Sequence, residues 1–135
     1  MELIYKLSEL EKASNFVLKN VSRDIILISG EVGTGKTTLI KEYCKLIGVE
    51  EIVNSPTYTL INEYQNMRRK IVHMDLYRVK DINEINELGL FEYLEKNIVI
   101  IEWPEIILKM IDIKYSLINI TFINKKERKL SIKNL

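Results

Sequence analysis

The segment GEVGTGKT, from Gly30 to Thr37, carries the pattern G-x-x-x-x-G-K-[ST]. In this pattern the glycines let backbone amides close around phosphate oxygens, the lysine reaches the β- and γ-phosphates, and the final hydroxyl contacts Mg²⁺. Lys36 and Thr37 occupy the last two positions. Because such a loop opens a helix, the positive end of the helix dipole also attracts phosphate. The segment therefore predicts a magnesium-nucleotide site.

Two acidic residues are placed to complete that site. Asp75 follows the apolar run 70–74, and Glu102 follows the apolar run 97–101. The carboxyl ends of neighbouring strands in an α/β sheet face the crevice beside the phosphate loop. We predict that Asp75 serves mainly as a metal ligand, and that Glu102 either binds the metal or orders a water for attack on the γ-phosphate. A helix cap or a solvent-facing acid is the alternative interpretation of each residue.

Three further side chains lie close to these motifs in the sequence. Thr57 follows a proline and could sense the γ-phosphate, although its residue type favours a turn-stabilising role. Trp103, the only tryptophan, adjoins Glu102, so that nucleotide contact and core packing are equally good explanations. For His73, the only histidine, a structural role is favoured over catalysis.

Buried strands and amphipathic helices must position these residues. Residues 24–29, DIILIS, form an apolar β-branched run of the kind that is buried on both faces in a parallel sheet. Residues 36–47 repeat apolar side chains at helical spacing, and Gly48 suits a left-handed end to that helix. This strand, the loop and the helix form the first structural unit of an α/β fold.

Periodicity and turn residues predict the other elements. They are a short strand over 3–5, a helix from a Ser8–Glu11 capping box to Asn20, a hairpin of 58–64 and 70–74, helices over 81–88, 90–96 and 105–111, and strands over 97–101, 115–123 and 128–132. The sequence shows no repeat and no linker, so we expect a single domain over 1–135.

The composition supports a globular chain and excludes several other classes. Of the 135 residues, 47% are hydrophobic and 29% are charged, and the net charge of +1 gives no overall positive field for binding nucleic acid. The single Cys44 cannot form an internal disulfide. The N-terminus lacks the order of a signal peptide, and no apolar run approaches about 18 residues. We therefore expect a cytoplasmic location and no membrane association.

Four segments together resemble the TsaE family of small bacterial ATPases, which are required for tRNA threonylcarbamoyladenosine biosynthesis. They are GEVGTGKTT at 30–38, SPTYTL at 55–60, HMDLYR at 73–78 and IEWPE at 101–105. Their order and spacing match the family. The resemblance implies a single P-loop NTPase-like three-layer α/β domain, with a mostly parallel central sheet and antiparallel hairpin additions.

The resemblance also implies ATP and Mg²⁺ as cofactors. As partner it implies a threonylcarbamoyltransferase heterodimer of TsaD and TsaB type proteins, with tRNA contacted only indirectly through that complex. It implies a metal role for Thr37 and Asp75, a switch-like role for Thr57, and an essential acid at Glu102. We expect Lys36, Thr57 and Glu102 to be catalytic, with Glu102 acting on the water or serving as a third metal ligand. The nucleotide-binding residues implied are Gly33, Thr34, Gly35, Lys36, Thr37 and Thr38, and we add Trp103 because it adjoins Glu102.

Two other functions also fit a phosphate loop in a chain of this size. A small-molecule kinase would need an acceptor pocket and usually an arginine-bearing lid. The basic cluster 68–70 instead lies in a predicted hairpin turn. A GTP-dependent switch would use an N-K-x-D element to select guanine, and residues 124–127, NKKE, approach it. This segment ends in Glu, however, and a polar turn explains it without guanine.

Overall fold

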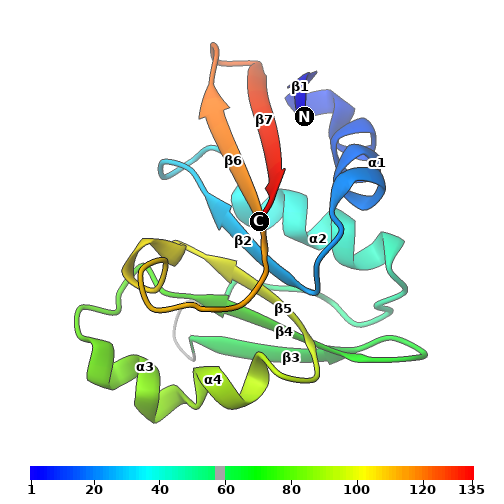
Figure 1. The fold of residues 1–135 in the computed structure, drawn as a ribbon. Helices are drawn as coiled ribbons and strands as arrows, with labels where there is room; N and C mark the ends of the chain where they lie inside the picture. The colour runs from blue at the N-terminus through cyan, green and yellow to red at the C-terminus, as the bar shows by residue number, and fades with distance from the viewer. Residues whose placement is uncertain (57–59) are drawn as a thin grey trace.

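A computed structural model describes residues 1–56 and 60–135 (Figure 1). Within these residues, the strands form one sheet in the order β1-β7-β6-β2-β5-β4-β3. The elements are β1 (Glu2–Lys6), the 3₁₀ turn η1 (Leu7–Glu9), α1 (Leu10–Asn20), β2 (Ile25–Ser29), α2 (Lys36–Leu46), β3 (Ile61–Gln65), β4 (Lys70–Asp75), α3 (Ile82–Leu88), α4 (Leu90–Tyr93), β5 (Ile98–Glu102), the 3₁₀ turn η2 (Pro104–Ile106), β6 (Ser116–Phe122) and β7 (Glu127–Asn134).

The centre of the sheet is parallel and its margins are antiparallel. Strands β6, β2, β5 and β4 run in one direction, so their carboxyl ends meet at the same edge. The β6–β7 hairpin and β1 extend one side, and β3 extends the other, all by antiparallel pairing. The prediction of a mostly parallel sheet with antiparallel additions is confirmed.

Helices cover both faces of the parallel strands, because alternate residues of each strand point to opposite sides. On β2, Ile26 and Ile28 pack with α1 and α2, whereas Ile25 and Leu27 pack with α3, α4 and the segment after β5. Figure 1 shows the two helix layers on opposite sides of the sheet. This arrangement gives the three layers that were predicted.

Cys44 lies on the buried face of α2 and is fully enclosed. Burial raises the pKa of its thiol to about 12. Within residues 1–56 and 60–135, no helix combines the length and the apolar character needed to cross a bilayer.

Three local predictions were inaccurate. The predicted helix 105–111 is only the turn η2 followed by irregular turns. The predicted helix 90–96 ends at Tyr93. The predicted Ser8–Glu11 capping box is replaced by an earlier contact, in which the Lys6 amide donates to Glu9 Oε1 at 2.9 Å. The chain turns there because the Leu7 amide bonds the Lys126 carbonyl at 2.8 Å, so α1 is entered through η1.

Candidate nucleotide-binding site

The phosphate loop connects β2 to α2 and depends on glycine at specific positions. Gly33 and Gly35 have φ angles of 82° and 101°, in the left-handed region that favours glycine. A Cβ atom at Gly30 would lie 2.7 Å from the Ile120 carbonyl oxygen, so only glycine fits beside β6. Gly35 is the N-cap of α2, and the first amides of a helix have no partner within it. The loop and helix therefore present free donors suited to an anion.

Lys36 is folded onto this loop. Its Nζ donates to the carbonyl oxygens of Gly30 at 2.6 Å and Glu31 at 3.0 Å, and lies 4.1 Å from the centre of the Trp103 ring. Burial lowers the pKa of Lys36, and the neighbouring carboxylates partly oppose this shift. The ammonium group thus faces the loop. In a nucleotide complex, phosphate oxygens would replace these two carbonyl oxygens as its partners.

Glu102 connects the loop to the end of β5. Its side chain is almost fully buried, and Oε1 accepts a hydrogen bond from Thr37 Oγ1 at 2.9 Å. The other oxygen, Oε2, lies 2.7 Å from Nε2 of His73, which is also buried. Glu102 and Thr37 therefore meet at the loop as predicted. For His73 the sequence favoured a structural role, and this contact places its side chain directly against Glu102.

Asp75 ends β4 and is paired in register with Glu102 on β5. Burial raises the pKa of Asp75 and the charge of Glu102 raises it further, while a hydrogen bond of 2.9 Å from the Tyr77 amide to Oδ1 lowers it. Two carboxyl groups are thus held side by side at some electrostatic cost. A bound cation would remove that cost.

These side chains fit a magnesium ion that is shared with a nucleotide. Mg²⁺ is usually bound by one or two carboxylates together with substrate phosphates, not by a protein cage. Accordingly, no cluster of three or more His, Cys, Asp or Glu side chains suited to a metal occurs in the described part of the chain. A hollow of about 320 Å³ is lined by both the loop and the two acids. Its lining residues are Val32, Gly33, Gly35, Lys36, Thr37, Thr38, Asp75, Tyr77, Glu102 and Trp103.

Thr34, a predicted cofactor-binding residue, makes hydrogen bonds that hold the loop together. Its amide and its hydroxyl both donate to the Glu31 carbonyl, at 3.2 Å and 2.9 Å, and its carbonyl accepts from Arg128 Nε at 3.2 Å. The residue is buried and does not line the hollow, because its polar groups close the loop instead. Thr57 lies outside the described residues.

Trp103 lies against the Lys36 ammonium group and also lines the hollow. Its φ of 56° is left-handed, and its amide bonds the Ile28 carbonyl at 3.2 Å, which fixes the turn after β5. The indole packs on Tyr77, with ring centres 4.7 Å apart. The sequence interpretation missed Tyr77, although it belongs to the HMDLYR segment. Its position two residues after a predicted metal ligand was the available signal.

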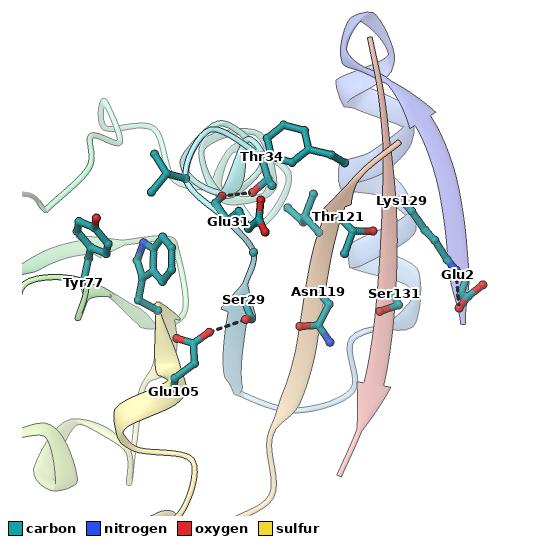
Figure 2. Close-up of a pocket in the computed structure, with 15 residues that line it drawn as sticks. Glu2, Ser29, Glu31, Thr34, Tyr77, Glu105, Asn119, Thr121, Lys129 and Ser131 are labelled. Carbon is teal, nitrogen blue, oxygen red and sulfur yellow. Dashed lines mark hydrogen bonds and ion pairs between the residues drawn. The ribbon is translucent and has the colours of Figure 1, made fainter. Parts of the chain in front are cut away.

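A larger groove of about 930 Å³ continues from the loop over β6, β7 and β1 (Figure 2). It lies on the face of these strands opposite α1 and α2, where Asn119, Thr121 and Ser131 point outward. On the side nearest the loop, Ser29 donates a hydrogen bond to Glu105, and at the far end Lys129 pairs with Glu2 at 3.3 Å.

Structural roles account for both features that suggested other functions. Asn124 Oδ1 accepts from the amides of Lys126 and Glu127, both at 2.9 Å, which is a turn contact. In the basic cluster, the Arg69 guanidinium bonds both carboxylate oxygens of Asp24, at 2.8 Å and 3.0 Å. Asp24 precedes β2, so this pair lies at the sheet edge opposite the phosphate loop.

Replacing Asp75 by asparagine tests whether the acid pair is arranged for a cation. A raised pKa means that the folded state loses stability as the pH rises through that pKa, and Asp75→Asn should lack this loss. We expect the variant without ligands to unfold a few degrees higher than the wild type at pH 8. The additional stabilisation that Mg²⁺ gives to the nucleotide complex should be lost.

Thermal unfolding between pH 4 and pH 8, with and without Mg-ADP, measures both effects. Asp112→Asn is a matched control, because Asp112 is exposed and borders a pocket with Asp24 at the opposite edge of the sheet. A normal Mg²⁺ effect in Asp75→Asn would contradict a metal role for Asp75.

Comparisons with known proteins match this chain to one family. The family model described as "Threonylcarbamoyl adenosine biosynthesis protein TsaE" matches residues 4–130. The chain is 37% identical over 111 residues to the tRNA threonylcarbamoyladenosine biosynthesis protein TsaE of Rickettsia typhi, covering 82% of this chain and 77% of that protein. It is 40% identical over 85 residues to the protein of the same name from Bacillus subtilis, covering 62% of this chain and about half, 52%, of the relative.

The fold also matches a solved structure. The crystal structure of YdiB from Bacillus subtilis superposes with a TM-score of 0.74 at 24% identity, over 98% of this chain and 84% of that one. At this identity the likeness concerns the fold alone. It supports the mixed sheet with a parallel centre.

Proposed function

This chain belongs to the TsaE family of threonylcarbamoyl adenosine biosynthesis proteins, a membership that implies nucleotide binding, and from its site we propose that it is a Mg²⁺-dependent ATPase. Its hydrolysis of ATP would drive the cycle of a threonylcarbamoyltransferase complex in tRNA modification. The partner we propose is the heterodimer of TsaD and TsaB type proteins, through which the chain would reach tRNA only indirectly.

One contact carries the proposal of hydrolysis. The Thr37 hydroxyl of the phosphate loop bonds the buried Glu102 carboxylate at 2.9 Å, with Asp75 beside it on the next strand. A loop that only bound phosphate would need neither acid. Buried carboxylates next to a phosphate loop are expected where a metal must be held and a water must be directed.

Each residue of the site has a proposed part in the reaction. The amides at the start of α2 bind phosphate oxygens, and Lys36 leaves its two carbonyl partners to contact the β- and γ-phosphates. Mg²⁺, held by Thr37, Asp75 and Glu102, would neutralise charge on the phosphoryl group. Glu102 orders the attacking water, and the Trp103 ring limits the access of bulk water. For Thr57 we propose a role in sensing the γ-phosphate.

The small size of the chain, 135 residues, leaves little room for a second buried substrate pocket. This supports the view that ATP hydrolysis changes the state of a partner protein and does not phosphorylate a small molecule. A kinase lid would need an arginine near the phosphates. Arg69 is instead paired with Asp24, at the edge of the sheet opposite the phosphate loop. A nucleotide can change the association with a partner only if the ATP and ADP states bind it with different affinity. We therefore propose that ATP favours the complex and that hydrolysis releases it.

Co-purification with the transferase heterodimer tests this function directly. We expect slow hydrolysis by the isolated chain, faster hydrolysis in the mixture, and recovery of the complex that is highest with ATP. Thr57→Ala should weaken the dependence of recovery on nucleotide. Equal recovery with ATP, with ADP and without nucleotide would contradict nucleotide-controlled association, and failure to recover the complex in any buffer would contradict the proposed partner.

A further inference from the structure

His73 is a polar residue in the middle of a buried strand. It lies on β4 opposite Ile100 of β5, and it is completely enclosed. Two residues away on the same face of β4 lie Ile71, which packs in the apolar core beneath α2, and Asp75, which ends the strand at the site. An apolar residue would suit this position better for stability alone. The position therefore calls for an explanation beyond packing.

The hydrogen bonds of the imidazole are unequal. Nε2 lies 2.7 Å from Glu102 Oε2, whereas Nδ1 is buried and has no hydrogen-bond partner among the described residues. An ionised carboxylate only accepts hydrogen bonds, so Nε2 carries the proton of this contact. A group that served only to satisfy the core would use both nitrogens. His73 instead directs its one hydrogen bond at the acid of the nucleotide site.

The contact fixes the orientation of the Glu102 carboxyl group. One oxygen is held by His73 and the other by the Thr37 hydroxyl at 2.9 Å, so the plane of the group is set from two sides. The two partners come from different elements, β4 and α2, and approach from the same face of the sheet. Without His73, the carboxyl group would keep one contact and could rotate about its terminal bond.

We propose that His73 is a positioning residue, whose Nε2–H orients the Glu102 carboxylate toward Thr37 and thereby supports ATP turnover. The inference rests on the proposed ATPase function. His73 lies beneath the acid and does not line the hollow between the loop and the acids, so its effect should fall on kcat and spare nucleotide affinity. Hydrogen-bonded partners of this kind affect activity by about 10- to 100-fold.

A pair of substitutions separates the hydrogen bond from the volume of the ring. His73→Gln can place an amide N–H near the position of Nε2, while His73→Met fills a similar volume without a donor. We expect His73→Met to lower kcat for Mg-ATP by about 10- to 100-fold, with nucleotide affinity within a few-fold of the wild type. His73→Gln should recover most of the rate. Ile71→Val, on the same face of β4, controls for loosened packing and should leave kcat unchanged.

Trp103 emission measures nucleotide affinity, and thermal unfolding measures stability, in parallel with the rate. An unchanged kcat in His73→Met, or an equal loss in the Met and Gln variants, would overturn the inference. If the wild type does not hydrolyse ATP with or without the heterodimer, the proposed function is wrong and a role for His73 in turnover is wrong with it. If the wild type hydrolyses ATP as expected and His73→Met hydrolyses it at the same rate, the proposed function stands and only the inference about His73 is wrong.

Nuclear magnetic resonance gives a readout independent of hydrolysis. Because the chain has one histidine, ¹⁵N-histidine labelling yields a single imidazole. We expect a proton on Nε2 whose resonance shifts in Glu102→Gln. A proton on Nδ1 alone would overturn the contact with Glu102, whatever the rate measurements show.

Discussion

Lys36→Ala should weaken ATP binding by about 100-fold or more and remove measurable hydrolysis, since each hydrogen bond to a charged group is worth about 1.5–3 kcal/mol and each 1.4 kcal/mol is a factor of ten. The ammonium group lies on two loop carbonyls and against the face of Trp103, and these three contacts belong to the site. Quenching or enhancement of Trp103 emission on nucleotide addition provides the binding curve.

The substitution must be distinguished from damage to the loop. Lys36 is only 5% exposed, and its removal leaves the Gly30 and Glu31 carbonyls without this donor. Circular dichroism and thermal unfolding should therefore accompany the binding measurement. Lys41→Ala, on the same helix but outside the hollow, is the matched control and should bind ATP normally. Tight ATP binding by a folded Lys36→Ala protein would remove the basis for the assigned site.

Glu102→Gln should lower the rate of ATP hydrolysis by about 10²- to 10⁴-fold while ATP still binds, because a positioned general base contributes about that factor. The amide has the shape of the carboxyl group and can still accept from Thr37 Oγ1. It lacks the charge that holds a metal and the basicity that activates a water. A single-turnover assay with bound Mg-ATP separates this loss from any change in affinity.

Glu105→Gln is the control for general loss of negative charge beside the loop. Glu105 lies three residues further along, on the turn after β5, and accepts a hydrogen bond from Ser29 outside the hollow. We expect its rate to stay within a few-fold of the wild type. Hydrolysis by Glu102→Gln at the wild-type rate, with normal dependence on Mg²⁺, would make Glu102 a structural residue.

Local patterns in the sequence identified much of the site. The phosphate loop, the strand before it and the helix after it form one continuous segment, so their relation follows from residue order. Asp75 and Glu102 could be predicted because each ends an apolar strand, and parallel strands bring their carboxyl ends together. These inferences needed no knowledge of which strands are neighbours.

The remaining features depend on pairing between distant segments. The contact of His73 with Glu102 requires β4 to lie beside β5 in one register, and a shift by one residue would turn His73 to the other face. The closure of the loop by Thr34 requires Arg128, 94 residues further along the chain. Neither relation has a signal within a short window of sequence.

The segment after β5 shows how local rules fail. Residues 105–111 have apolar side chains at helical spacing and follow a proline, which predicts a helix. The left-handed turn at Trp103 directs the chain across the sheet, where Ile107 enters the core and the backbone bonds mix three- and four-residue steps. β-Branched isoleucines have modest helix propensity, so burial of Ile107 decides the conformation.

The enclosed thiol of Cys44 makes the chain convenient for single-molecule work. Burial raises the pKa of this thiol to about 12, so the reactive thiolate is scarce at neutral pH, and the side chain is inaccessible to reagents in the folded protein. A fluorophore could therefore be attached to an added cysteine on the β3–β4 turn, for example at the fully exposed Met67, without removing the native thiol. The distance from such a dye to one on the proposed transferase partner would then measure whether the two proteins associate and when they separate.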